Sequence, residues 1–309
     1  MTPRTGRAKK KKSGGGFRTA VLLVVAVACG AVVTWASRGC RAPERPAPGP
    51  AKTPAAAAPA LARPPKTTAA RMPADFESVD GRAGAGVVAV VLDDLGYDER
   101  ALATLAGWNA PLAVAVIPSA PYAARAVALA KEKGWDLLVH LPMEPEAGPS
   151  EAEAIGSRDS DDVIRVKLLQ ALARTPGALG INNHQGSKAT ADARVVRAVL
   201  GVVKEKSLFF LDSRTTGASV VGTEAALLHV PFLARDVFLD DVAAETAAKG
   251  GAPEALDAAW ERTREIAAKK GEAIVIGHPH RETLAFLEKK LASEKSAGAR
   301  LIKVSELVP

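Results

Sequence analysis

The chain has 309 residues and a formal net charge of +7, and its positive excess lies in residues 1–86, which hold 15 Lys and Arg against 4 Asp and Glu. Residues 87–309 hold 26 Lys and Arg against 30 Asp and Glu, so the foldable part is mildly acidic and no nucleic-acid partner is expected. Both cysteines, Cys29 and Cys40, precede this part, which excludes a disulfide or a cysteine-ligated zinc site within it.

The first 84 residues predict a membrane anchor followed by a tether. Residues 1–18 form a basic tail, and residues 19–37 carry no charge over a length that lets a helix cross the hydrocarbon core. The basic cluster predicts a single-pass signal-anchor in the inner (cytoplasmic) membrane, with the N-terminus in the cytoplasm and the rest of the chain outside it. A cleaved signal peptide and lipidation at Cys29 are alternatives with the same exported outcome. Residues 38–84, rich in Pro and Ala, are expected to be a disordered linker.

Residues 85–309 show repeated strand–helix units and form the predicted catalytic domain. Short apolar runs alternating with helical stretches predict a parallel α/β sheet covered by helices. About seven units favour a distorted (β/α)₇ barrel over a doubly wound open sheet. In chain order the expected elements are strand 87–92, helix 99–106, strand 112–117, helix 121–133, strand 135–141, helix 161–174, strand 178–182, helix 191–204, strand 208–211, a helix early in 218–240, strands 230–233 and 237–239, helix 253–270, strand 273–276, helix 281–293 and strand 300–304.

Almost every predicted strand ends in residues that can carry chemistry. Parallel strands of a barrel open onto one face, so we expect these side chains to converge there. Four of the five histidines occupy such strand ends. The polar residues at the strand ends are Asp93, Asp94, His140, Asn182, Asn183, His184, Asp212, Ser213, Arg214, Asp240, Asp241, His278 and His280.

Each of these residues taken alone also has a structural explanation. An Asp pair after a strand often caps a turn or a helix, and a lone histidine such as His140 is more often a core residue than a ligand. Asp212 suits a buried ion pair, and we assign His229, at the start of a short apolar run, a structural role. The joint convergence of Asp94, His140 and His184 on one face is what favours function.

One carboxylate and two imidazoles form a ligand set for Zn²⁺ or a similar divalent ion, with positions left for water and substrate. Asp94, His140 and His184 are the expected ligands. A second carboxylate can take a proton from the attacking water, and a further histidine can protonate the leaving group. Asp93 and His278 suit these two roles.

At these residues the chain resembles the divergent polysaccharide deacetylases, which are related to the NodB-type carbohydrate esterases. The resemblance covers roughly residues 87–307 and implies a distorted (β/α)₇ barrel that hydrolyses N- or O-acetyl groups on carbohydrate polymers. It also implies that Asp93 is the base, His278 the acid, and Asp94, His140 and His184 the metal ligands. The motifs are Val-Leu-Asp-Asp-Leu-Gly (91–96), His-Leu-Pro-Met-Glu (140–144), Gly-Ile-Asn-Asn-His-Gln-Gly-Ser (180–187), Phe-Leu-Asp-Ser-Arg-Thr (210–215), Arg-Asp-Val-Phe-Leu-Asp (235–240) and Gly-His-Pro (277–279).

The chain departs from the better-known esterases at two motifs. Their paired histidines are reduced to His140 followed by Glu144, which is a candidate further ligand or partner of a ligand. Their Arg-Pro-Tyr motif is replaced by Asn-Asn-His, so Asn183 or a backbone amide near Ser187 is the candidate oxyanion donor. The residues expected to contact substrate are Asn183, Ser187, Asp212, Arg214 and Asp240.

The leading hypothesis is therefore a zinc-type deacetylase acting on peptidoglycan or an exported polysaccharide. A catalytically silent glycan-binding or wall-regulating protein on the same fold is the second hypothesis. Glycosidase chemistry with two carboxylates, such as Asp93 with Asp212 or Asp240, is the third.

Overall fold

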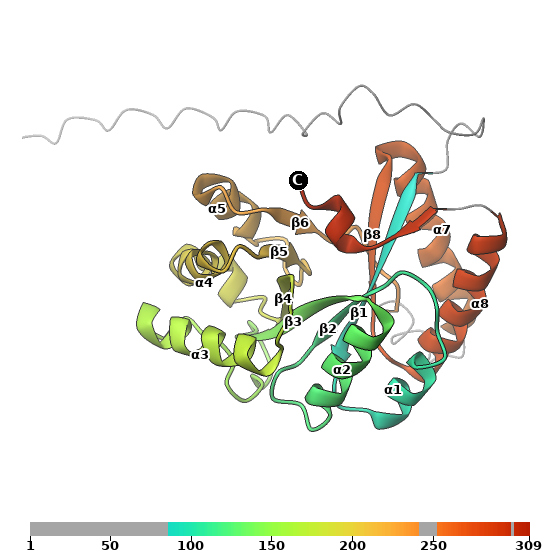
Figure 1. Ribbon diagram of the computed structural model, residues 1–309. Helices are drawn as coiled ribbons and strands as arrows, with labels where there is room; N and C mark the ends of the chain where they lie inside the picture. Colours follow the sequence, from blue (N-terminus) through green and yellow to red (C-terminus); the bar gives the residue numbers. More distant parts are fainter. Residues whose placement is uncertain (1–85, 241–251, 298–299) are drawn as a thin grey trace, which may run out of the picture. The chain divides into compact units, whose positions relative to one another are not determined.

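The computed structural model of the protein describes residues 86–240, 252–297 and 300–309 (Figure 1). The predicted tail, membrane anchor and linker (1–18, 19–37 and 38–84) lie outside these residues. None of the helices in the described ranges combines the length and the apolarity that a membrane span requires.

The strands of the described residues pair in parallel in a single curled sheet. Their order is β6-β5-β4-β3-β2-β1-β8-β7, with β9 beside the start of β1, and it lacks the reversal of a doubly wound sheet. The predicted parallel α/β sheet is thus confirmed. The strands are β1 (Val87–Leu95), β2 (Ala113–Val116), β3 (Asp136–Met143), β4 (Gly180–Gln185), β5 (Phe209–Asp212), β6 (Phe232–Ala234), β7 (Val237–Phe238), β8 (Glu272–Gly277) and β9 (Arg300–Ile302).

The curl is that of a half-barrel and is less complete than the predicted (β/α)₇ barrel. The segment 232–238 pairs with β5 at its start and with β8 at its end. However, β6 has three residues and β7 only two, so few backbone hydrogen bonds join β5 to β8 through this segment.

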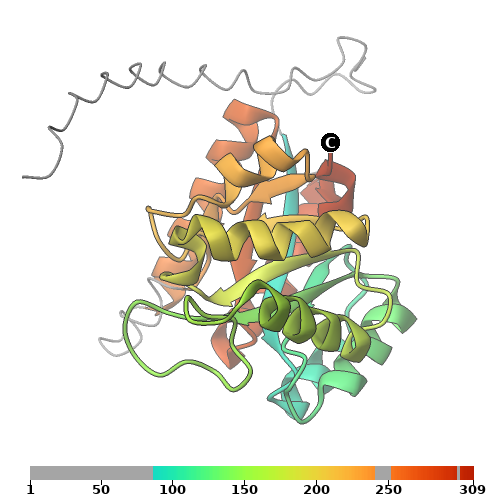
Figure 2. The ribbon, with the colours of Figure 1, turned by 90° about the vertical axis from the view of Figure 1, so that its left-hand side faces the viewer.

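Helices surround the outside of the sheet (Figures 1 and 2). Apolar side chains of α1, α2, α7 and α8 pack on one part of it, and those of α3, α4 and α5 pack on another. The helices are α1 (Glu99–Leu105), α2 (Ala123–Lys133), α3 (Asp161–Arg174), α4 (Ala193–Glu205), α5 (Val221–Leu228), α7 (Ala252–Lys270) and α8 (Arg281–Ala297), with short 3₁₀ helices η1 (Ala189–Ala191) and η2 (Val304–Leu307).

The inner face of the sheet is apolar at one end and polar at the other. Val91, Leu138 and Ile276 belong to one buried cluster on that face. Side chains two residues apart on a strand share a face, so Asp93 and His140 stand above Val91 and Leu138. The strand period therefore places the candidate catalytic residues on top of an apolar floor.

Candidate metal centre

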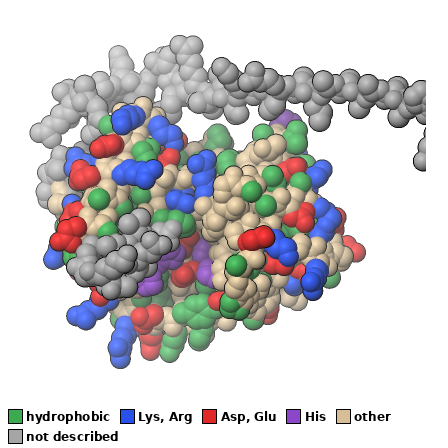
Figure 3. All heavy atoms as spheres, turned by 180° about the vertical axis from the view of Figure 1, so that it is seen from behind, with side chains coloured by type: hydrophobic (Ala, Val, Ile, Leu, Met, Phe, Trp, Pro, Cys, Tyr) green, Lys and Arg blue, Asp and Glu red, His purple; other side chains and the backbone are tan. Residues whose placement is uncertain are grey.

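Three donor atoms from three strands meet at the carboxyl ends of β1, β3 and β4. Asp94 Oδ1 lies 2.9 Å from His140 Nε2 and 2.8 Å from His184 Nδ1, and the two ring nitrogens are 3.2 Å apart. The register of β3 and β4 aligns His140 with Asn182 and Pro142 with His184, so the two histidines lie on the same face. Figure 3 shows histidine and acidic side chains meeting in a hollow on the side away from the view of Figure 1.

The backbone at Asp94 lets two successive aspartates reach one histidine. The pairing of β1 with β2 is irregular between Leu92 and Leu95, and Asp94 has a φ of 56°. In a regular strand neighbouring side chains point to opposite faces. Here His140 Nε2 lies 3.7 Å from Asp93 Oδ2 as well as 2.9 Å from Asp94 Oδ1. The left-handed conformation is uncommon for a residue other than glycine, and such strain is concentrated at functional sites.

The triad of Asp94, His140 and His184 fits a divalent ion. Ligand bonds of about 2.0–2.2 Å set neighbouring donor atoms of one ion roughly 3 Å apart, as these atoms are. Asp94 Oδ1 is also buried without a hydrogen-bond partner of acceptable geometry among the described residues. Burial raises the pKa of Asp94, but the closeness and the charges of His140 and His184 outweigh burial and lower that pKa well below its usual value. The carboxylate is therefore ionised and directed at the same point as both rings.

Asn182 connects the triad to Asp93. Its side-chain oxygen is 2.9 Å from His140 Nδ1, and its Nδ2 donates to Asp93 Oδ1 at 2.7 Å and to Ser213 Oγ at 3.3 Å. An amide oxygen accepts only, so His140 carries its proton on Nδ1 and offers the Nε2 lone pair to the site. Asn182 is fully buried, and this contact fixes both the tautomer and the ring orientation.

Asp93 is a buried carboxyl group among charged neighbours. Burial raises its pKa most strongly and the charge of Asp94 adds to this, whereas His140, His278 and the Asn182 amide lower it. The net result is a pKa above the ordinary value. A carboxylate with a raised pKa is a stronger base, which suits proton abstraction near neutral pH.

His278 and Asp240 form a second Asp–His arrangement. Asp240 Oδ1 is 2.8 Å from His278 Nδ1, while Oδ2 accepts hydrogen bonds from the His278 backbone N–H at 2.6 Å and from Thr283 Oγ1 at 3.0 Å. Burial lowers the pKa of His278, but Asp240 and the charges of Asp93 and Asp94 raise it to about 9. His278 is therefore protonated at neutral pH.

A model of the divergent polysaccharide deacetylase family matches residues 90–308. The chain belongs to this family. An uncharacterized protein of Haemophilus influenzae is 37% identical over 206 residues, 65% of this chain and 69% of that protein. The uncharacterized protein YibQ of Escherichia coli K12 is 32% identical over 225 residues, 72% of this chain and 68% of that protein. These matches confirm the resemblance given by the six motifs.

A solved structure shows the same fold. An uncharacterized protein from Agrobacterium tumefaciens C58 has a TM-score of 0.66 at 22% identity, over 74% of this chain and 91% of that one. At 22% identity this likeness shows a shared fold alone, because one fold can carry many different functions.

Four predicted substrate-contacting residues take part in hydrogen bonds that join neighbouring strands and loops of the protein. Asn183 Nδ2 donates to the Gln185 carbonyl at 2.9 Å, and its Oδ1 accepts from the Ser213 backbone N–H at 2.9 Å. Ser187 Oγ accepts from the Glu146 N–H at 2.8 Å. Asp212 accepts from the Arg214 N–H and the Ser219 hydroxyl, in place of the suggested ion pair. The exposed Arg214 has a φ of 49° directly after β5. The fifth, Asp240, forms the dyad with His278.

Glu144, the other candidate ligand, lies in a separate network. Its Oε1 accepts from Lys188 Nζ at 2.7 Å, and its Oε2 accepts from the N–H and the hydroxyl of Ser157, each at 2.7 Å. These donors lower the pKa of Glu144 to about 2. The Glu144 carboxylate therefore links the end of β3 by hydrogen bonds to the loop that contains Ser157 and to the loop that contains Lys188.

Sequence reasoning gave Asn182 a place at a strand end but no role, and it missed Glu151 and Tyr97. The role of Asn182 could have been inferred, because it lies two residues before His184 on the same strand face. Glu151 Oε1 lies 3.8 Å from His184 Nε2, and its Oε2 accepts from the Tyr97 hydroxyl at 3.0 Å. Glu151 comes from the loop after β3, and no strand pattern places it.

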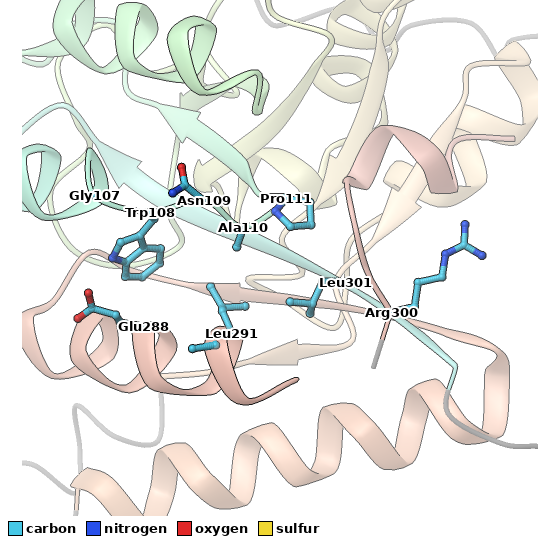
Figure 4. A pocket seen from close by; sticks show the side chains of 10 residues that line it. Gly107, Trp108, Asn109, Ala110, Pro111, Glu288, Leu291, Arg300 and Leu301 are labelled. Atoms are coloured by element: carbon cyan, nitrogen blue, oxygen red, sulfur yellow. The ribbon is translucent and has the colours of Figure 1, made fainter. Parts of the chain in front are cut away.

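A separate cavity of about 540 Å³ lies away from these residues, between the loop before β2 and the α8–β9 region (Figure 4). Trp108, Pro111, Leu291 and Leu301 contribute its apolar surface, and Glu288 and Arg300 are its charged lining residues. It contains none of the triad or dyad side chains. The hollow at the carboxyl ends of the strands is therefore the better candidate for chemistry.

Proposed function

We propose that this protein is a metal-dependent hydrolase that removes acetyl groups from a polysaccharide of the cell envelope, either peptidoglycan or an exported glycan. The observation that carries the proposal is the meeting of Asp94 Oδ1, His140 Nε2 and His184 Nδ1 within 3.2 Å of one another. Membership of a deacetylase family supports the reaction class. The uncharged stretch 19–37 supports a location outside the cytoplasm.

Asp94, His140 and His184 would hold the ion. When bound, a divalent ion such as Zn²⁺ polarises the acetyl carbonyl and lowers the pKa of water to about 7. Asp93 accepts the proton that the attacking water loses as its oxygen bonds to the acetyl carbonyl carbon. Asn182, hydrogen-bonded to both Asp93 and His140, keeps the base aligned with the ligand set.

His278 supplies the second proton. Its pKa of about 9 keeps the ring cationic at neutral pH, and Asp240 fixes the proton on Nδ1 and the orientation of the ring. As the acetyl C–N or C–O bond breaks, the leaving nitrogen or oxygen takes the proton of His278. Acetate and the free amino or hydroxyl group of the sugar are the products.

The test is acetate release from acetylated glucosamine polymers and from peptidoglycan by the full-length protein, with and without a chelator. We expect release that the chelator abolishes and that Zn²⁺ restores. The Asp93→Asn variant should keep its ion and its fold but lose activity by about 10²- to 10⁴-fold. Cleavage of the glycan chain unaffected by chelator would indicate a glycosidase, and glycan binding without acetate release would indicate a silent binding protein.

A further inference from the structure

The loop between β3 and α3 approaches the metal centre, and backbone hydrogen bonds hold its two ends together. The Glu144 N–H donates to the Ile155 carbonyl at 2.8 Å, and the Ile155 N–H donates to the Pro142 carbonyl at 2.9 Å. Ile155 is fully buried in the cluster under α3 and α4. Between these ends, the Glu146 N–H donates to Ser187 Oγ at 2.8 Å and Gln185 Nε2 donates to the Pro149 carbonyl at 3.5 Å, so the loop lies beside the end of β4.

Within this loop, Glu151 lies between Tyr97 and His184. One of its oxygens accepts the Tyr97 hydroxyl at 3.0 Å, which leaves Oε1 to face His184 Nε2 at 3.8 Å. The other ring nitrogen of His184 lies 2.8 Å from Asp94 Oδ1. The imidazole of His184 therefore has a carboxylate at each of its two nitrogens.

The two ligand histidines present different nitrogens to the site. His140 presents Nε2 and hydrogen-bonds through Nδ1 to the Asn182 amide oxygen. His184 presents Nδ1, so its proton must lie on Nε2, which faces Glu151. A ligand histidine usually donates its remaining N–H to a carboxylate or carbonyl, which orients the ring and makes the ligand nitrogen more basic.

We propose that Glu151 is the positioning residue of His184 and that Tyr97 holds Glu151 in place, so that the metal affinity depends on this loop. The inference rests on the proposed metal-dependent function. The 3.8 Å separation is about 1 Å longer than an N–H···O hydrogen bond, and catalytic contacts of this kind shorten when the site is loaded. The negative charge of Glu151 also favours a nearby dication.

The test compares two glutamates of the same loop in the full-length protein. Zn²⁺ affinity is measured by competition with a chromophoric chelator. Glu151→Gln should raise the Kd for Zn²⁺ about 10- to 100-fold. Glu153→Gln is the matched control, because Glu153 pairs with Arg174 on the surface, and it should leave the Kd unchanged.

Tyr97→Phe tests the same contact without changing the charge of the loop. It should raise the Kd for Zn²⁺ by less than Glu151→Gln does, while Tyr122→Phe, at another exposed tyrosine, should not change it. The ¹⁵N resonance of His184 Nε2 in the zinc-loaded protein should show a bound proton in the wild type and should shift in Glu151→Gln.

Equal affinities for the two Glu→Gln variants, with an unchanged Nε2 resonance, would overturn the role of Glu151 and leave the proposed function standing. A wild-type protein that binds no Zn²⁺ would overturn both. A loss of affinity in Glu153→Gln as large as in Glu151→Gln would also overturn the inference, because it would show a general effect of the loop.

Discussion

The site contains two Asp–His arrangements that are alike in composition and opposite in hydrogen bonding. In the triad, Asp94 Oδ1 has no hydrogen-bond partner of acceptable geometry among the described residues, and it faces two ring nitrogens. In the dyad, three donors on His278 and Thr283 contact the two oxygens of Asp240. A buried carboxylate that lacks donors attracts a cation, whereas one that accepts an imidazole N–H keeps that imidazole protonated. Hydrogen-bond satisfaction, more than residue type, distinguishes the two roles.

The largest effect is expected from Asp94→Asn, which removes the charge from the unsatisfied carboxylate. Loss of a ligand should weaken ion binding by more than the roughly 10- to 100-fold typical of an outer partner, and acetate release should be lost with it. Metal content of the purified protein and acetate release are the measurements. Asp240→Asn is the control and should retain the ion; if it loses the ion instead, the proposed division of roles is wrong.

His278→Gln should show the opposite pattern, with the ion kept and the proton donor lost. We expect kcat for acetate release to fall by about 10²- to 10⁴-fold at unchanged metal content. His280→Gln, at an exposed histidine two residues away, should behave like the wild type. Loss of the ion in His278→Gln would make His278 a ligand and remove the distinction between triad and dyad.

Strand periodicity predicted most of this arrangement from the sequence. The ends of parallel strands share a face, so Asp94, His140 and His184 were expected together, and they do meet. The irregular backbone at Asp94 follows from no pattern, because only the pairing of β1 with β2 reveals it. Glu151 was missed because it lies far from the strand ends in sequence.

The dyad also predicts how the pH profile changes on mutation. Activity that needs protonated His278 should fall as the pH rises through about 9. Asp240→Asn should shift the pH at which activity falls toward the ordinary histidine pKa of about 6.5. A bound dication lowers both values, so the difference between wild type and variant is the quantity to measure in kcat against pH. If kcat of the variant falls at the same pH as kcat of the wild type, Asp240 does not hold the proton of His278.

The same dyad links stability to pH. The pKa of His278 is raised in the folded protein, so the dyad stabilises the fold fully below about pH 6.5 and loses this contribution as the pH rises through about 9. The pH dependence of Tm should therefore be weaker in Asp240→Asn than in the wild type over this range.

The smallest effect is expected from Glu144→Gln, which removes the charge of a third carboxylate that can be compared with Asp94 and Asp240. Donors from Lys188 and Ser157 contact both of its oxygens, so by the reasoning that separates Asp94 from Asp240 it should bind no ion. The variant should keep wild-type metal content and zinc affinity, and lose about 1 kcal/mol of unfolding free energy with the weakened hydrogen bonds. This corresponds to a fall in Tm of about 2–4 °C, measurable by calorimetry. A reduced zinc affinity would instead make Glu144 a ligand. It would also show that a carboxylate that accepts several hydrogen bonds can still bind the ion.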